Sequence, residues 1–430
     1  MRPEKTMYAD ATAGDLAQHK GGLLTSVKGQ KNLPRYFAPV MRIVQTLQVG
    51  SLILVLPDGR KFIAHGQPGV SPISKQALHA ELHVHNTAFF SRLVREGDLG
   101  FADSYLDGWW STPDLQALMD LFHAGNERLY DGFPGLGLLR LFENLIYWLH
   151  SNTRRQAMKN ISYHYDLGNE FYGLWLDETM TYSSALFQSG DQSMASAQTA
   201  KYAAMIDQMG VEPGDHVLEI GCGWGGFAVY AAQNRGLRVT GLTISKEQLA
   251  YAEDRVQRLN LGHLVNLKLQ DYRDEQGVYD GVASIEMFEA VGEKYWPQYF
   301  EIVRRALKPG ARATLQIIMV QDKRFDVYRK SVDFIQKYIF PGGMLPSPSV
   351  LQSQITKAGL TKTASVEFGR SYSQTLRQWH DRFNARWDEV AQLGFDDRFR
   401  RMWNMYLTSC ASAFESGYCD VTQITMKKPH

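Results

Sequence analysis

The sequence predicts an α/β protein whose larger part is a doubly wound, mostly parallel sheet, preceded by a small α+β domain. Three observations support this. From residue 161 onward, short apolar runs alternate with amphipathic stretches, as in parallel α/β sheets. Residues 221–226 form a glycine-rich turn directly after one apolar run. Residues 50–64 read as two strands joined by a Pro-Asp-Gly turn, which is a hairpin pattern.

Length and composition are those of a globular protein with two to three domains. The 430 residues are 44% hydrophobic and 21% charged, and the net charge of +1 gives no reason to expect nucleic-acid binding. Cys222, Cys410 and Cys419 show neither metal-ligand spacing nor a disulfide framework, so we expect no metal. The N-terminus lacks the apolar core of a signal peptide, and no 18-residue apolar run occurs. These features together predict a cytoplasmic protein.

Residues 1–125 are expected to form the N-terminal α+β domain, with a role in lipid or membrane contact. Strands are predicted at 50–56, 61–64 and 80–85, and helices at 88–94 and 114–124. Trp109 and Trp110 could line an acyl groove, although large aromatic side chains more often belong to the core.

Residues 126–160 are predicted to be a helical linker. Its segment 136–149 is strongly apolar and is followed by basic residues. Such a helix could lie at a lipid interface, or it could pack between domains or subunits.

Residues 161–430 hold the predicted parallel sheet. The expected strands are 216–220, 237–242, 264–269, 279–285 and 312–319. Residues 322–350 have little helical or strand regularity, and we expect them to form a lid over the cofactor.

The glycine turn limits the choice of cofactor. Gly221, Gly223 and Gly226 satisfy a dinucleotide fingerprint, which also requires an acid about 20 residues further on. The second strand ends without such an acid. Glu219 instead precedes the first glycine and gives E-x-G-x-G-x-G, which resembles the first motif of Rossmann-like class I methyltransferases that use S-adenosyl-L-methionine. We therefore favour a methyltransferase over a dehydrogenase.

Further motifs resemble one family in order and spacing. The catalytic part of the cyclopropane-fatty-acyl-phospholipid synthases and mycolic acid cyclopropane synthases is similar to residues 163–169, 180–185, 218–226, 241–248, 270–274, 287–292, 337–343 and 406–414. The resemblance covers about residues 160–428. Residues 108–110 are similar to the N-terminal domain of the longer, phospholipid-acting members.

The resemblance implies a reaction. The methyl group of S-adenosyl-L-methionine passes to the double bond of an unsaturated fatty acyl chain of a membrane phospholipid. A carbocation forms, and proton loss gives a cyclopropane or a methyl-branched or methylene fatty acid. An apolar slot and aromatic faces near the cation would be needed. The resemblance also implies a peripheral position at the inner membrane face and a homodimer.

The resemblance also implies which residues hold the cofactor. They are Tyr182, Ser183, Glu219, Gly221, Gly223, Trp224, Thr243, Ile244, Gln248, Asp271 and Tyr272. Ser245 and Gln248 also form a capping-box pattern, so Gln248 could serve only to cap its helix.

The implied catalytic set departs from the family. Members typically hold a bicarbonate as base with a cysteine, a glutamate, a histidine and a tyrosine. Glu289 and Tyr372 match the glutamate and tyrosine, whereas Ser184 replaces the cysteine and Gln316 the histidine. These side chains can still donate hydrogen bonds to an anion but carry no positive charge. Bicarbonate therefore stays open, and we hypothesise a methyl-branched olefin or methylene product.

Cys410 matches a cysteine associated with the family's site. It lies in a predicted helix among apolar residues, where a cysteine is usually a structural core residue.

Two other functions remain open from the sequence. One is a small-molecule C- or N-methyltransferase. The other is a lipid-binding protein with a decayed methyltransferase site, because Ser184, Ala290 and Gln316 depart from the family.

Overall fold

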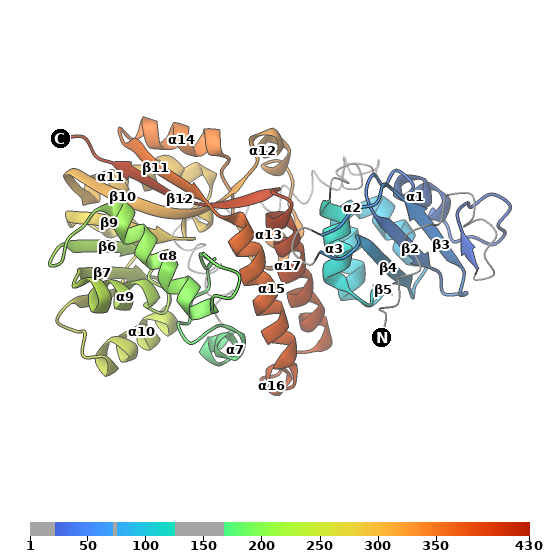
Figure 1. The fold of residues 1–430 in the computed structure, drawn as a ribbon, viewed down its shortest axis with the longest axis horizontal. Coiled ribbons are helices and arrows are strands. Elements are labelled where there is room, and N and C mark those ends of the chain that lie inside the picture. The colour runs from blue at the N-terminus through green and yellow to red at the C-terminus, as the bar shows by residue number, and fades with distance from the viewer. Residues whose placement is uncertain (1–21, 72–74, 125–166) are drawn as a thin grey trace, which may run out of the picture. The chain divides into compact units, whose positions relative to one another are not determined.

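The chain divides into two compact units, residues 1–139 and residues 140–430. The computed structural model describes residues 22–71, 75–124 and 167–430, and Figure 1 shows both units. The apolar segment 136–149, expected to be an interfacial or packing helix, lies outside the described residues.

A five-stranded sheet forms the first unit, with strand order β1-β3-β2-β4-β5. Its strands are β1 (Leu23–Leu24), β2 (Ser51–Val55), β3 (Lys61–His65), β4 (His79–Val84) and β5 (Trp110–Ser111). Its helices are α1 (Phe37–Val44), α2 (Ala88–Leu106) and α3 (Leu115–His123). The predicted hairpin is confirmed, because β2 and β3 pair antiparallel.

Two details of this unit refine the sequence analysis. The helix expected at 88–94 continues to Leu106 across a break at Gly97, whose φ of 60° and ψ of −133° are not helical. Trp110 is 1% exposed, and its ring centroid lies 4.4 Å from that of Phe101, so this tryptophan is a core residue.

A seven-stranded sheet forms the second unit, with strand order β11-β12-β10-β9-β6-β7-β8. Its strands are β6 (His216–Ile220), β7 (Arg238–Thr243), β8 (Val265–Leu269), β9 (Tyr279–Ile285), β10 (Leu307–Val320), β11 (Thr361–Glu367) and β12 (Cys419–Lys427). Five neighbouring strands of this sheet, β10, β9, β6, β7 and β8, run parallel to one another. Strand β12 pairs antiparallel with both β10 and β11. The predicted doubly wound, mostly parallel sheet is thereby confirmed.

Helices cover both faces of this sheet (Figure 1). One apolar cluster joins α8 (Met194–Met209), α9 (Gly226–Arg235) and α10 (Lys246–Arg258) to the strands. The other joins α11 (Trp296–Ala306) and α14 (Pro348–Lys357) to the opposite face. Strands β6 and β9 are almost continuously buried, as expected for parallel strands covered on both sides.

The remaining helices lie around the carboxyl ends of the parallel strands. They are α7 (Gly168–Trp175), α12 (Asp322–Tyr328), α13 (Phe334–Tyr338), α15 (Gly369–Ala385), α16 (Trp387–Gln392) and α17 (Asp397–Glu415), together with the 3-10 turns η2 (Tyr272–Asp274), η3 (Phe288–Ala290) and η4 (Glu293–Tyr295). The prediction that 322–350 lacks regular structure was wrong. The segment holds α12 and α13, and an Asp333–Gln336 capping box fixes the start of α13.

Candidate active site

A glutamate that the sequence analysis did not select lies at the centre of the predicted catalytic residues. Glu286 follows β9 directly and has a φ of 49°, an uncommon conformation for a residue other than glycine. Its Oε1 accepts hydrogen bonds from the backbone N of Ser184 at 2.8 Å and from Nε2 of Gln316 at 2.7 Å. Its Oε2 accepts from the hydroxyl of Tyr372 at 2.7 Å. The structure therefore brings three of the five predicted catalytic residues together, around Glu286.

The three donors come from separate parts of the fold. Ser184 belongs to the loop after α7, Gln316 to β10 and Tyr372 to α15. All three are nearly inaccessible, at 0%, 1% and 6% exposure, whereas Glu286 keeps partial exposure. Donors from three separate elements therefore fix the orientation of the carboxylate.

The electrostatic balance at Glu286 has two opposing parts. Desolvation raises the pKa of this carboxyl above its usual value, while the charge of Lys201 and the hydrogen bonds from Tyr372, Gln316 and Ser184 lower it. Hydrogen bonds to the charged form favour ionisation. Desolvation is the largest of these effects, so the net pKa of Glu286 is raised, and the three donors and Lys201 limit that rise.

Glu289, the predicted catalytic glutamate, makes a different contact. Its Oε1 accepts from the backbone N of Ile318 at 2.5 Å, and its buried Oε2 has no hydrogen-bond partner among the described residues. Burial, followed by the nearby charge of Glu286, raises the pKa of Glu289 to about 8. Glu289 is therefore mostly protonated at pH 7. Its role in catalysis stays a prediction.

Among the described residues, Cys410 makes no hydrogen bond to Glu286. Burial raises the pKa of its thiol well above the usual value, so the sulfur is not a thiolate near neutral pH. Neutral thiols are poor nucleophiles and bases. The structure favours the packing interpretation of this cysteine.

Aromatic rings surround Tyr182 and form the other side of the site. The ring centroid of Tyr182 lies 5.3 Å from that of Tyr172, 5.5 Å from that of Trp175 and 5.4 Å from that of Trp379. The hydroxyls of Tyr182 and Tyr406 are 2.8 Å apart. Such faces can stabilise a nearby cation.

The glycine turn after β6 has the geometry of a ligand-binding loop. Gly221 and Gly223 have φ values of 84° and 52°, which glycine adopts without strain. A Cβ at Gly221 would come within 2.8 Å of Cγ of Met287, whereas one at Gly223 would meet nothing within 4 Å. The turn therefore leaves an open surface at Gly223 next to the start of α9.

Glu219 lies directly beneath this turn. It is 2% exposed, and its Oε2 has no hydrogen-bond partner among the described residues. Burial raises the pKa of its carboxyl to about 8. An unsatisfied buried acceptor next to the turn suits a ligand that brings hydrogen-bond donors or positive charge.

The other predicted cofactor residues lie at the same sheet edge. Oγ1 of Thr243, at the end of β7, donates to Oε1 of Gln248 at 3.1 Å. The backbone N of Gln248 reaches Oγ of Ser245 at 3.3 Å, so half of the predicted capping box is present. Ile244 follows β7 directly.

Four further predicted cofactor residues have partners within the protein. Nε1 of Trp224 donates to Oδ1 of Asn169 at 2.7 Å, which connects α7 to the glycine turn. Asp271 holds the side chain of Arg273 in a short ion pair, and Tyr272 begins the turn η2. Ser183 is 4% exposed and lies beside Lys201.

The residues present fit S-adenosyl-L-methionine but not bicarbonate. The open surface at Gly223 and the unpaired Oε2 of Glu219 provide a cradle for the first. The donors expected to bind bicarbonate, Ser184, Gln316 and Tyr372, already serve Glu286. The three donors are thus already bonded to a protein carboxylate.

Two important residues escaped the sequence analysis, Glu286 and Lys201. The only available signal for Glu286 was its position, immediately after a buried strand at the carboxyl edge of a parallel sheet, where ligands bind. Lys201 lies inside an ordinary helical pattern and gave no signal.

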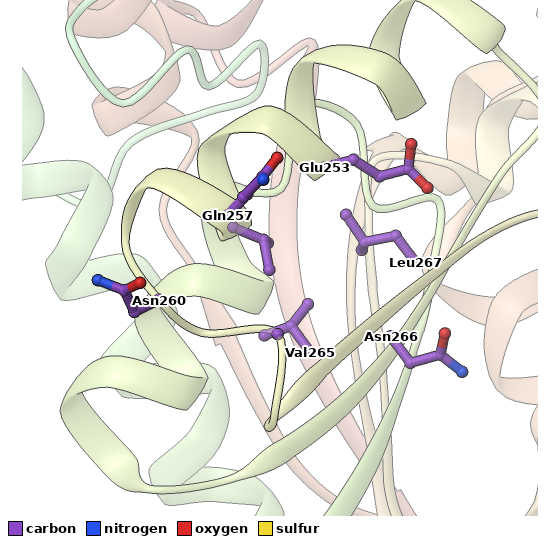
Figure 2. A pocket seen from close by; sticks show the side chains of 8 residues that line it. Glu253, Gln257, Asn260, Val265, Asn266 and Leu267 are labelled. Carbon is purple, nitrogen blue, oxygen red and sulfur yellow. The ribbon is translucent and has the colours of Figure 1, made fainter.

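A pocket elsewhere in this unit is separate from the site. It lies between the later part of α10 and β8, and is lined by Glu253, Val256, Gln257, Asn260, Gly262, Val265, Asn266 and Leu267 (Figure 2). None of the predicted site residues lines it.

Comparisons with known proteins identify the family. The family model described as mycolic acid cyclopropane synthetase matches residues 152–424. The chain is 37% identical over 358 residues to the tuberculostearic acid methyltransferase UfaA1 of Mycobacterium tuberculosis, covering 79% of this chain and 81% of that protein. It is 38% identical over 352 residues to the cyclopropane-fatty-acyl-phospholipid synthase of Escherichia coli K12, covering 81% and 88%.

Solved structures agree with this result. The cyclopropane synthase MmaA2 from Mycobacterium tuberculosis superposes with a TM-score of 0.59 at 29% identity, covering 63% of this chain and 98% of that one. The mycolic acid cyclopropane synthase CmaA1, complexed with SAH and CTAB, gives the same TM-score and coverage at 30% identity. The chain therefore belongs to the mycolic acid cyclopropane synthetase family and is an S-adenosylmethionine-dependent methyltransferase.

Proposed function

We propose that this enzyme methylates the double bond of an unsaturated acyl chain in a membrane phospholipid, and that Glu286 is the base that completes the reaction. Methyl transfer to an unsaturated lipid follows from the family. The observation that carries the rest is the cluster in which Ser184, Gln316 and Tyr372 donate to Glu286.

S-adenosylmethionine supplies an electrophilic methyl group, and the glycine turn at Gly221 and Gly223 would hold it with Glu219 and Gln248. The chain's own residues must then tolerate a positive charge on the acyl chain and remove one proton. The aromatic faces around Tyr182 can stabilise the cation without reacting with it.

Glu286 has the properties that the proton transfer requires. As the C–H bond breaks, its electron pair stays with carbon and forms either the third ring bond or a new C=C bond. A methylene product also requires a hydride to move first from the methylated carbon to the neighbouring cationic carbon, so that the proton is then lost from the methyl group. The proton passes to a carboxylate oxygen of Glu286. Three neutral donors keep the carboxylate in one orientation, and general bases of this kind contribute about 10² to 10⁴ in rate.

The membrane surface is the proposed place of action. The relative from Escherichia coli is named for a fatty-acyl-phospholipid substrate, which resides in bilayers. In the described part of the chain, no helix is long and apolar enough to cross a bilayer. We accordingly propose reversible, peripheral binding at the inner face by a homodimer, testable by liposome flotation and by light scattering.

The test of the function uses purified protein, methyl-labelled S-adenosylmethionine and liposomes containing a mono-unsaturated phospholipid. Mass analysis of the acyl chains should find the mass of one added CH₂, with the label in the chain. Transfer to small amines but not to lipid would overturn the proposal. A Glu286→Gln variant that binds the cofactor yet transfers as fast as the wild type would overturn the role of Glu286.

A further inference from the structure

A buried lysine lies behind the carboxylate cluster. Lys201, in the middle of α8, is 0% exposed. Its Nζ donates to Oγ of Ser183 at 2.7 Å and to Oε1 of Gln198 at 2.6 Å. Both acceptors are neutral. An ammonium group removed from water needs compensation, and hydrogen bonds to neutral oxygens supply only part of it.

Carboxyl groups on other elements provide the compensation. Burial lowers the pKa of Lys201 to about 7, and the nearby carboxyl groups of Glu286, Asp177 and Glu219 oppose that shift. Glu286 has the largest of the three effects. In the reverse direction, Lys201 is the main charge that lowers the pKa of Glu286. The lysine and the proposed base therefore stabilise each other's charged forms.

Lys201 also lies at the centre of the contacts that aim two donors at Glu286. Its Nζ donates to Oγ of Ser183. Nε2 of Gln198 donates to the backbone O of the same serine at 3.0 Å. Ser183 directly precedes Ser184, whose backbone N donates to Glu286.

The second donor is aimed through β12. Nε2 of Gln423 donates to the backbone O of Lys201 and to Oε1 of Gln316, each at 3.2 Å. Since the oxygen of Gln316 is thereby occupied, its Nε2 is left to face Glu286 at 2.7 Å. The segment around Lys201 thus orients both donors to Oε1 of Glu286.

We propose that Lys201 is a positioning residue of the reaction: its ammonium group holds Ser183, and through it the backbone donor of Ser184, and places a positive charge behind Glu286 until the carboxylate takes the proton of the substrate. This inference rests on the proposed role of Glu286. The lysine gains and loses no proton in this step, because the proton passes directly from the C–H bond of the substrate to Glu286.

Among the described residues, the groups that influence the titration of Glu286 come from several elements. They are Lys201 from α8, Tyr372 from α15 and Glu289 from η3, while Ser184 and Gln316 contribute neutral donors. Lys201 faces Asp177 and Glu219 in addition. Of these groups, Lys201 carries the positive charge that opposes the protonation of Glu286.

The test compares the pH profile of single-turnover methyl transfer to liposomes in the wild type and in Lys201→Met. Loss of the charge raises the pKa of Glu286, so the acidic limb of the profile should move to higher pH by about one unit. At pH values below both acidic limbs, a shift of one unit corresponds to a rate about tenfold lower than that of the wild type. The difference should shrink as pH rises. A purely structural role would lower the rate equally at all pH values.

Lys428→Met is the matched control. Nζ of Lys428 donates to the backbone O of Leu307 at 2.6 Å, and its removal should leave both the limb and the rate unchanged. An acidic limb in Lys201→Met that coincides with that of the wild type would overturn the inference. Absence of any transfer by the wild type would instead overturn the proposed function.

A stability measurement covers the case in which Lys201→Met does not fold. The double variant Lys201→Met/Glu286→Gln carries neither buried charge, and it should be folded and more stable than Lys201→Met alone. A double variant no more stable than the lysine variant would overturn the inference, because the two charges would then not be coupled.

Discussion

Tyr372 on α15 donates its phenolic hydrogen to Glu286 at the end of β9, across 2.7 Å and 86 positions of sequence. The contact connects the C-terminal helical pair to the carboxyl edge of the parallel sheet. It gives Glu286 its donor to Oε2, while Ser184 and Gln316 share Oε1.

Tyr372→Phe should therefore weaken the proposed base without removing it. A hydrogen bond to a charged group contributes about 1.5–3 kcal/mol, and its loss raises the pKa of Glu286. The acidic limb of the pH–rate profile should move up by about one unit, with cofactor affinity unchanged by calorimetry. Tyr406→Phe, which removes a hydroxyl bonded to Tyr182 rather than Glu286, should leave the limb in place. Equal shifts in both variants would contradict this account.

Gly221→Ala should impair cofactor binding. The residue has a φ of 84°, and an added Cβ would come within 2.8 Å of Cγ of Met287. Gly214→Ala is the control for strain alone, because Gly214 has a φ of 92° and a Cβ there would meet nothing within 4 Å. Both should lose about 1–2 kcal/mol of stability. Calorimetry should find weaker cofactor binding only in Gly221→Ala, and unchanged binding in that variant would count against the site.

Glu289 should make stability depend on pH. Its pKa rises in the folded state from 4.5 to about 8, so the native state holds a proton that the unfolded state releases. The resulting stabilisation is complete below pH 4.5 and is lost as pH rises toward 8.

Glu289→Gln removes this dependence. The free energy of unfolding of the variant, relative to the wild type, should rise between pH 4.5 and 8 by at most about 1.4 kcal/mol per pH unit. Denaturant titrations at several pH values measure it. A difference that does not change with pH would show that Glu289 ionises normally.

The product is predicted to be a methylene or methyl-branched olefin rather than a ring. Four hydrogen bonds fix Glu286. Three come from its side-chain donors, and its own backbone N donates the fourth to the carbonyl of Gln316 at 2.9 Å. The carboxylate can therefore reach only a restricted set of substrate C–H bonds. Catalytic hydrogenation followed by mass analysis distinguishes the outcomes, because the olefin takes up hydrogen under mild conditions. A saturated ring as the sole product would exclude this prediction.

Much of the fold could be predicted from the sequence because parallel strands are buried on both sides. The runs at 216–220 and 279–285 coincide with β6 and β9 for this reason. The short helices α12 and α13 were missed, although Asp333 and Gln336 carry a capping signal. A helix of five residues is too short for periodicity to reveal.

The part of the site that could be predicted is the part defined by the spacing of residues in a sequence motif. The glycine turn lies at the carboxyl edge of the sheet, as the motif predicts, whereas Tyr372 contacts Glu286 and not the expected Glu289. Glu286 was missed because motif matching selected Glu289 three positions later, and because the left-handed conformation of a glutamate cannot be read from its sequence. Lys201 was missed because a lysine within a helix usually faces solvent, and only the packing of α8 reveals its burial.

The central claim is that Glu286 performs the task expected of an external bicarbonate. The most direct measurement is the rate of methyl transfer to liposomes in buffers freed of carbon dioxide and in buffers with added bicarbonate, for the wild type and for Glu286→Gly. The wild-type rate should not depend on bicarbonate, and Glu286→Gly should be nearly inactive until bicarbonate is added. A wild-type rate that falls when bicarbonate is removed, or a glycine variant that is fully active without it, would exclude this role of Glu286.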